Sequence, residues 1–246
     1  LLASALLACQ GAGKSDAPAA APASKPAAPA ASATPAAVPA KGWITLFDGT
    51  DVAKNFRGFK GDAVPSSWVV KDGCLVHLKS AGDGHMVGGD LVTRDSWCNF
   101  ELELEWKITP GGNSGIFYRG TEEYDHIYWT APEYQLLDDS LASDNKTRLT
   151  CAGAAYGLYP SPAGHLKPVG EWNSTRIVAR GNHVEHWLNG FKLLEYELNS
   201  PEWLGLVAKS KFNAWPKYGR NTKGHIALQG DHTGTLAFRN IRIREF

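Results

Sequence analysis

The sequence predicts an all-β domain built as a sandwich of antiparallel sheets. Beyond residue 42 the apolar runs are short, rich in Val, Ile, Trp and Phe, and separated by Gly, Asp and Asn, which is a strand pattern. The runs recur about every 8 to 12 residues, a spacing typical of sandwiches. No helical pattern alternates with them, which argues against a parallel α/β fold, and no internal repeat indicates a propeller or solenoid.

Turn residues separate the expected strands and define two hairpins. Asp72-Gly73 and Asn189-Gly190 each place a Gly where a tight hairpin needs positive φ. Ser200 followed by Pro201 predicts the start of one short helix, which we expect to run to about residue 211. Strands are expected at residues 44–47, 68–70, 74–76, 91–93, 101–108, 114–119, 133–138, 153–158, 176–179, 184–188, 191–196, 224–229 and 236–244.

The stretch from 105 to 138 organises the rest of the chain. Residues 110–113 read Pro-Gly-Gly-Asn, and we expect them to form a hairpin loop between strands 101–108 and 114–119. If these strands and strand 133–138 share one sheet, their carboxylates, an arginine and an amide converge on one polar face.

Strand alternation assigns the side chains of this stretch to faces. Because successive side chains point to opposite sides of a sheet, the Glu residues at 101, 103 and 105 share one face and the apolar residues between them face the core. We expect Glu101 and Glu103 to be the solvated face of the strand. Glu133 and Gln135 are two residues apart, so they point the same way, opposite to the apolar residues of their strand.

Composition divides the 246 residues into a domain and a tail. Residues 10–41 are mostly Ala and Pro, which cannot bury enough apolar surface to fold, so we expect a disordered tether there. Residues 42–246 form the single expected domain. The formal net charge is zero, with Lys and Arg spread along the chain, which favours neither nucleic acid nor an anionic membrane surface as the main partner.

Residues 1–9 resemble the end of a secretory signal. Leu-Leu-Ala-Cys at 6–9 is similar to a bacterial lipobox, and we expect Cys9 to become a lipid-modified N-terminus. The protein is then expected to be an exported lipoprotein of the bacterial cell envelope, on the periplasmic side or the cell surface, with the lipid as its contact with the membrane. An ordinary signal region with a chance Cys is the alternative.

Three further cysteines show no zinc spacing. An odd number outside the cytoplasm allows at most one internal disulfide, for which Cys74 and Cys98 are the nearer pair. Burial of Cys74, Cys98 and Cys151 as three small apolar side chains explains them equally well.

A series of motifs resembles one family. These are LFDGT at 46–50, WVVKDGCL at 68–75, NFELELEWKITPGGNSGIFYR at 99–119, EYQLLDD at 133–139, EWNSTRI at 171–177, HWLNG at 186–190 and HIALQGDHTGTLAFRNIRI at 225–243. In this order they are similar to the DUF1080 family, the 3-keto-disaccharide hydrolases. The resemblance implies a concanavalin A-like jelly roll of two curved sheets and cleavage of 3-keto-glycosides, after a separate sugar 3-dehydrogenase has oxidised the sugar.

That chemistry needs particular groups. A ketone at C3 acidifies the proton at C2, so a base can remove it while the glycosidic oxygen at C1 leaves, and donors must stabilise the enolate. The proton-transfer candidates are Glu105, Glu133 and His232, with Asp231 to orient His232. No Gly-rich dinucleotide fingerprint follows a strand, so no redox cofactor is expected.

The remaining candidates bind substrate. Arg119 is expected to bind sugar oxygens or the oxyanion, unless it is a structural ion-pair partner of Glu133. Trp203 could also stack on a ligand. The candidate substrate-binding residues are Arg119, Gln135, Asn113, Gln229, Arg239, Trp129 and Trp215. We expect one cleft to contain Glu105, Arg119, Glu133, Gln135, His232 and Arg239.

Three alternatives stay open. Asp138, Asp139 and Asp144 could hold a Ca²⁺ ion, but turn capping explains them equally well. Ordinary glycoside hydrolysis by two carboxylates could replace the elimination. The domain could also be a non-catalytic, lectin-like carbohydrate-binding module or a structural domain, because a fold does not determine a function.

Overall fold

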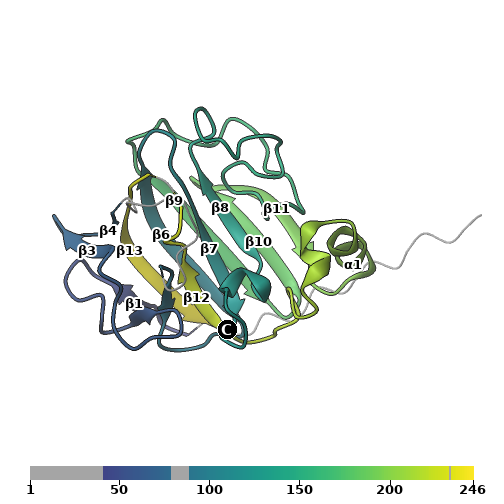
Figure 1. Cartoon of the computed structure of the whole chain (residues 1–246), viewed down its shortest axis with the longest axis horizontal. Coiled ribbons are helices and arrows are strands. Elements are labelled where there is room, and N and C mark those ends of the chain that lie inside the picture. The colour runs from purple at the N-terminus through teal and green to yellow at the C-terminus, as the bar shows by residue number, and fades with distance from the viewer. Residues whose placement is uncertain (1–40, 79–88, 233) are drawn as a thin grey trace, which may run out of the picture. The chain divides into compact units, whose positions relative to one another are not determined.

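The computed structural model describes residues 41–78, 89–232 and 234–246. Two antiparallel sheets form a sandwich, as the sequence predicts (Figure 1). The signal and tether expected at 1–9 and 10–41 lie outside the described residues except for Lys41, so these remain predictions. The helices of the described part are all too short or too polar to cross a lipid bilayer.

The larger sheet has eight strands. Its order is β11-β10-β9-β6-β13-β4-β3, and β1 pairs with β13 off this path. The strands are β1 (Ile44–Phe47), β3 (Trp68–Lys71), β4 (Cys74–His77), β6 (Phe100–Ile108), β9 (Asn173–Arg180), β10 (His183–Leu188), β11 (Phe191–Glu197) and β13 (Leu236–Glu245).

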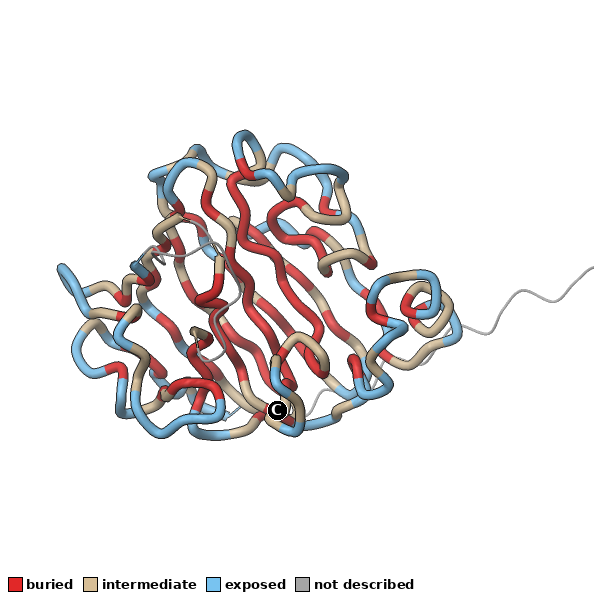
Figure 2. Tube along the Cα trace, in the orientation of Figure 1, coloured by how far each residue is buried: buried red, intermediate tan, exposed pale blue. Residues whose placement is uncertain are grey.

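The smaller sheet has five strands in the order β2-β5-β12-β7-β8. These are β2 (Phe56–Gly58), β5 (Leu91–Thr93), β7 (Asn113–Gly120), β8 (Glu133–Leu137) and β12 (His225–Leu228). The main core lies between the two sheets and is built from their alternating apolar residues. Figure 2 shows this as buried residues along the central strands and exposed residues in the loops.

A second, smaller apolar cluster covers part of the outer face of the five-stranded sheet. It contains Val92 of β5, Phe117 of β7 and Ala227 of β12, packed against Ile127 of the short 3₁₀ helix η1 (Ile127–Trp129). The segment around η1 therefore lies over this sheet, and the rest of the same face is left for a pocket.

The turns at 72–73 and 189–190 and the predicted start of the helix are confirmed, but the helix ends at Ala208 rather than near residue 211. Asp72 and Gly73 both have positive φ in the β3–β4 turn, as do Asn189 and Gly190 between β10 and β11. The helix α1 (Pro201–Ala208) begins after Ser200, whose side chain accepts a hydrogen bond from the Trp203 backbone N–H. A 3₁₀ helix, η2 (Lys211–Ala214), follows it.

Two strand predictions are wrong. Residues 153–158 form turns rather than a strand, and within them only Ala155 makes isolated bridges, to Tyr134 and Tyr159. Residues 110–113 do not close a hairpin: β6 lies in the eight-stranded sheet and β7 in the five-stranded sheet, so the chain crosses between the sheets at this loop. Strand β6 instead pairs with β9 and β13.

Cys74, Cys98 and Cys151 are all free thiols. Cys151 is buried, and the other two are half-buried, so the structure matches small side chains packed without a disulfide.

Candidate active site

A pocket of about 490 Å³ opens over the outer face of the five-stranded sheet. Strands supply its floor, and the loop at 142–146 and the segment that contains η2 supply its walls. The lining residues are Gly111, Asn113, Tyr128, Glu133, Gln135, Ala142, Ser143, Asp144, Lys146, Tyr156, Lys211, Phe212, Trp215, Gln229 and His232.

Glu133 is the buried carboxyl group of this pocket. Strand alternation places it as predicted: Glu133 and Gln135 line the pocket, whereas Tyr134 and Leu136 belong to the core between the sheets. Burial raises the pKa of Glu133 to about 8, and the nearby Lys211 ammonium acts in the opposite direction. A carboxyl group with such a pKa can exchange a proton near neutral pH.

The backbone of β7 makes room for this carboxyl group. A Cβ atom on Gly115 would lie 2.2 Å from Glu133 Oε1, so only glycine fits beneath the Glu133 side chain. Gln135 is paired with Gly115 across the two strands. With its NH₂ group turned toward the acceptors around it, the Gln135 amide donates to Ser114 O at 2.9 Å and to Glu133 Oε1 at 3.1 Å.

Amide and imidazole groups complete the floor. The Ser114 hydroxyl donates to the Gln229 carbonyl at 2.8 Å, and the Gln229 N–H donates to Gly115 O at 3.0 Å, which joins residue 229 to β7. His232 lines the pocket, with its Nε2 3.7 Å from Asp231 Oδ1. Asp231 is buried beside it, and its role in orienting His232 stays a prediction.

The opposite wall contains residues that the sequence analysis missed. Tyr156 donates a hydrogen bond to Asp144 Oδ2 at 2.9 Å, and its backbone N–H donates to Glu133 O at 3.1 Å. Lys211 Nζ lies 4.4 Å from the centre of the Tyr156 ring. Burial, with Asp144 next, raises the pKa of Tyr156. Tyr156 lies in the segment wrongly predicted as a strand, and Lys211 lies at the predicted end of the helix but belongs to η2, so the expected elements gave no reason to place either residue in a pocket.

Trp215 forms an aromatic rim. Its indole stacks on Trp129, with ring centres 5.8 Å apart and planes 17° apart, and Tyr128 meets it edge-on. Of the two tryptophans proposed to bind substrate, Trp215 lines the pocket and Trp129 supports it from behind. Trp203 is fully buried in the core and is not a ligand platform.

A column of stacked aromatic rings anchors the segment that contains Lys211 and Trp215. Neighbouring ring centres are 4.1 to 6.2 Å apart in this column, and the planes are within 15° of one another. The rings are those of Tyr159, Tyr196, Trp203, Tyr218 and Phe212.

The expectation of one shared cleft is wrong for three residues. Glu105 and Arg239 lie on β6 and β13 of the other sheet, where Arg239 Nε donates to Glu105 Oε2 at 2.8 Å. Arg119 is buried, and its guanidinium donates to the Cys98 carbonyl rather than pairing with Glu133. The crossover between β6 and β7 explains Glu105 and Arg239, since it puts β6 and its partner β13 in the other sheet. Arg119 is on β7, in the same sheet as Glu133, but its φ of +56° at a register shift with β12 breaks the alternation of the strand.

Glu101 is also not the solvated side chain that was expected. It is buried, with Oε2 accepting from Arg244 and Oε1 2.5 Å from Arg176 Nε. Arginines on both neighbouring strands enclose it, which the pattern of a single strand does not reveal.

Asp138 and Asp144, two of the residues considered for Ca²⁺, make different contacts. Asp138 accepts hydrogen bonds from Gly111 N–H, Ser140 N–H and the Ser140 hydroxyl, so it holds the turn. Burial acts to raise the pKa of Asp138. The hydrogen bonds together outweigh burial, so the pKa of Asp138 is lowered. Asp144 instead faces Tyr156 in the pocket.

The fold and the pocket define a β-sandwich protein with a buried titrating carboxyl group among amides, lysines and an aromatic rim. Residues 42–244 match the family described as the 3-keto-alpha-glucoside-1,2-lyase-like domain, and the chain belongs to this family. The family match confirms the resemblance stated from the motifs.

Several known proteins are similar to the chain. A 3-keto-disaccharide hydrolase from Bacteroides thetaiotaomicron is 38% identical, covering 83% of this chain and 79% of that protein. A crystal structure of a candidate glycosyl hydrolase from Parabacteroides distasonis is 33% identical, with a TM-score of 0.75 over 83% of this chain and 94% of that one. A galectin-like protein from Bacillus subtilis, 10% identical with a TM-score of 0.52 over 84% of this chain and 96% of that one, shares the fold alone. The family and its relatives support a carbohydrate-active enzyme.

Proposed function

We propose that the pocket cleaves the glycosidic bond of 3-keto-glycosides by elimination, with Glu133 as the base. The observation that carries the proposal is the Glu133 carboxyl group, buried in a sugar-sized polar pocket with a pKa of about 8. The relative from Bacteroides thetaiotaomicron is named for 3-keto-disaccharides, and this supports the substrate class.

The step needs a base stronger than an ordinary carboxylate. The ionised Glu133 carboxylate takes the proton from C2, and the C2–H electron pair is delocalised onto the C3 oxygen as an enolate. This pair then forms the C1–C2 double bond while the C1–O bond breaks, with the C1–O electron pair going to the leaving oxygen. A pKa of about 8 makes Glu133 a better proton acceptor than a solvated glutamate, while part of it remains ionised at neutral pH. Addition of water to the resulting unsaturated sugar then completes the overall hydrolysis.

Charge on the C3 oxygen requires a cation or donors nearby. Lys211 meets this need, because it lines the same pocket and is close enough to act on the pKa of Glu133. It takes the role that the sequence analysis gave to Arg119. The side chains of Asn113 and Gln229 supply hydrogen bonds for sugar hydroxyl groups, and we assign protonation of the leaving oxygen to His232.

The ketone must come from elsewhere. We propose that a separate sugar 3-dehydrogenase oxidises the substrate before it reaches this protein. Anchoring by a lipid at Cys9 on the bacterial envelope would place the pocket where exported or extracellular glycosides are met, and the intact mass of the exported protein tests that anchor: a mature chain that begins elsewhere and carries no lipid contradicts it.

The reaction is tested by incubating the protein with a 3-keto-glucoside beside its unoxidised parent and measuring release of the aglycone. Release from the 3-keto form alone supports elimination. Equal release from both would replace it with two-carboxylate hydrolysis, for which Glu133 and Asp144 are the carboxyl groups of the pocket. Binding without release from either would leave the lectin-like alternative.

The role of Glu133 is tested by Glu133→Gln and by pH. The substitution keeps the shape and removes the titrating group, so we expect kcat to fall about 10²- to 10⁴-fold. Glu105→Gln, which alters a carboxyl group of the other sheet, is the matched control and should keep near-full activity. If Glu133 is the base, kcat/KM rises with pH through about 8 and levels off above it, whereas a fall through about pH 8 would make Glu133 the acid instead.

A further inference from the structure

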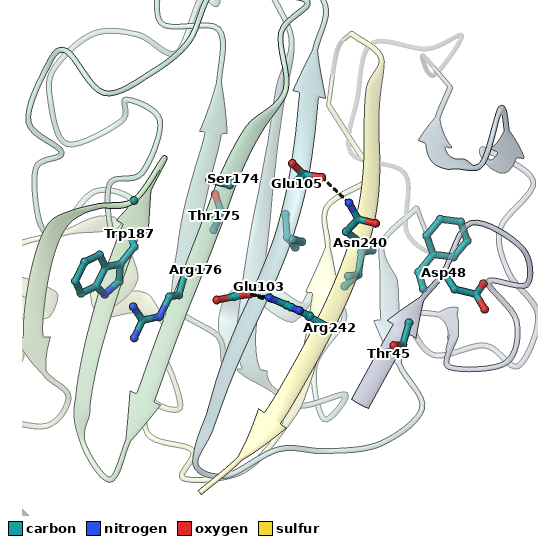
Figure 3. Close-up of a pocket in the computed structure, with 14 residues that line it drawn as sticks. Thr45, Asp48, Glu103, Glu105, Ser174, Thr175, Arg176, Trp187, Asn240 and Arg242 are labelled. Atoms are coloured by element: carbon teal, nitrogen blue, oxygen red, sulfur yellow. Dashed lines mark hydrogen bonds and ion pairs between the residues drawn. The ribbon is translucent and has the colours of Figure 1, made fainter. Parts of the chain in front are cut away.

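A second hollow lies on the outer face of the eight-stranded sheet. It has a volume of about 770 Å³, larger than the pocket over the other sheet. Side chains of five adjacent strands line it, from β10 through β9, β6 and β13 to β1 (Figure 3). Neighbouring strands are about 4.8 Å apart, so the hollow, here called the outer groove, extends roughly 20 Å across the sheet.

The outer groove is not built for proton transfer. Burial acts to raise the pKa of Glu105, but hydrogen bonds from Arg239 and Asn240 outweigh it and lower the pKa. Glu105 therefore stays an anion. Glu103 is likewise held by Arg242, whose Nε and Nη2 donate to it at 2.9 and 2.6 Å. The chemistry proposed above has no counterpart here.

Charge pairing on this face indicates the kind of ligand that the outer groove fits. Glu103 pairs with Arg242, Glu105 with Arg239, and Arg176 with the buried Glu101. Asp48 also lines the groove, and Arg244 is a second partner of Glu101, so the carboxylates and arginines of this face are equal in number and neither charge is in excess. A charged polymer would gain little from it, whereas a neutral molecule rich in hydroxyl groups could bond to both donors and acceptors.

Acceptors remain available in the groove after this pairing. The hydrogen bonds from Arg242 to Glu103 both end on Oε2, and so do those from Arg239 and Asn240 to Glu105. The Oε1 atoms of these half-exposed side chains can then accept hydrogen bonds from ligand hydroxyl groups. At one end stands the half-buried Trp187, whose indole N–H donates to Glu185 at 2.7 Å and whose ring lies 4.7 Å from the Arg176 guanidinium. This indole offers an apolar contact in a fixed position.

A strained residue points into the same groove. Asn240 has a φ of +53° in the middle of β13, where the pairing with β6 shifts by one residue between Arg239 and Arg242. This bulge lets the consecutive residues Arg239 and Asn240 both reach Glu105, at 2.8 and 2.6 Å, although neighbours in a regular strand point to opposite faces. Bulges and left-handed non-glycine residues inside a sheet are typical of sites that re-aim a side chain.

We propose that the outer groove is a second, non-catalytic site that binds a neutral oligosaccharide chain. Its separation from Glu133 by the whole sandwich would let the protein hold a glycan on one face while the other face cleaves a small glycoside. The proposal does not rest on the reaction proposed above, because binding to the outer groove needs no ketone.

The test uses neutral hexasaccharides of α-1,4-, β-1,4- and β-1,3-linked glucose, titrated into the full protein by calorimetry. Asn240→Gly keeps the left-handed backbone and removes the amide, and Trp187→Ala removes the end wall. Each should weaken binding of a hexasaccharide about tenfold or more. Neither should change aglycone release from a small 3-keto-glucoside. Trp172→Ala, which removes a half-buried indole just before β9 that also contacts cations but does not line the groove, is the control.

Four results would overturn the proposal. The first is that no neutral hexasaccharide binds. The second is that only a charged polymer, such as dextran sulfate or polygalacturonate, is retained in affinity electrophoresis. The third is that Trp215→Ala, at the other pocket, abolishes hexasaccharide binding while Asn240→Gly and Trp187→Ala leave it unchanged. The fourth is that Trp172→Ala weakens binding as much as Trp187→Ala does, which would indicate a general disturbance of the face.

Discussion

Glu133 links the burial of one residue to the stability of the chain. Its carboxyl group lies over Gly115, next to the Gln135 amide, and is nearly excluded from water. The folded state therefore favours the protonated form, while the unfolded chain ionises near pH 4.5. The same burial that makes a strong base costs stability whenever the group must ionise.

The sign of this effect can be measured. Because the pKa of Glu133 is raised in the folded state, the contribution of this group to the free energy of unfolding is fully present below about pH 4.5 and is lost as pH rises through about 8. Glu133→Gln removes the titration, so its stability relative to the parent should increase between pH 5 and 9, by on the order of 4 kcal/mol at most. Urea unfolding of both proteins at several pH values measures the difference. An offset that does not vary with pH would contradict the raised pKa.

At the scale of elements, the paired strands β7 and β8 hold the carboxyl group of the pocket in place. Strand β8 supplies Glu133 and Gln135, and β7 supplies the glycine on which the carboxyl group rests. Strand β8 is also held on its other edge, where Gln135 N–H donates to Ala154 O at 3.1 Å and Gly153 N–H donates to Gln135 O at 2.8 Å. The segment after the acidic loop thus fixes the edge strand that contains the proposed base.

Gly115→Ala tests this arrangement. The added methyl group would overlap Glu133 Oε1, so the carboxyl group must move while the strand pairing can persist. We expect a loss of kcat of about 10²-fold or more, since a small displacement of a catalytic group has an effect of this size. Circular dichroism should show an intact β-sandwich. Gly205→Ala, on α1 with open space around its Cβ position, is the matched control. Full activity of Gly115→Ala would remove Glu133 from the reaction.

Across the whole molecule, a buried polar network connects the two sheets. His186 of β10 is fully buried, with Nε2 3.0 Å from the Tyr118 hydroxyl of β7 and Nδ1 3.0 Å from Gly153 O. The Tyr118 hydroxyl also contacts that of Tyr196. Burial lowers the pKa of His186 to about 4, opposed by the hydrogen bond to Gly153. The imidazole is therefore neutral in the folded protein across the physiological range.

Acid should destabilise the sandwich through this histidine. In the unfolded chain a histidine takes up its proton near pH 6.5, so between about pH 6.5 and 4 the unfolded state binds more protons and the free energy of unfolding falls as pH falls. The loss is on the order of 3 kcal/mol. His186→Gln, which keeps a donor and an acceptor, should lose less stability than the parent over this range in thermal unfolding. Equal acid sensitivity would show that other groups set it.

How far the sequence predicts this molecule depends on the range of each interaction. Alternation within one strand places Glu133 and Gln135 correctly, because it involves neighbouring residues. It cannot show that β6 and β7 belong to different sheets, and this is why Glu105 and Arg239 lie far from the pocket. Lys211, at the start of η2, and Tyr156, in a turn that was predicted as a strand, reach the pocket through long-range packing that no local pattern predicts.

Because of the bulge in β13, deleting one residue or its neighbour has different consequences for this strand. From Leu236 to Phe238 the buried side chains fall on even positions, and from Ile241 to Ile243 they fall on odd positions. Asn240 is the additional residue that separates these two phases. Excising Asn240 would leave a strand of unbroken alternation with every arginine still outward, whereas excising Ile241 would leave a polar residue in its place. A chain that lost Asn240 should therefore still fold, so the core does not require this additional residue, which serves the outward face of the sheet alone.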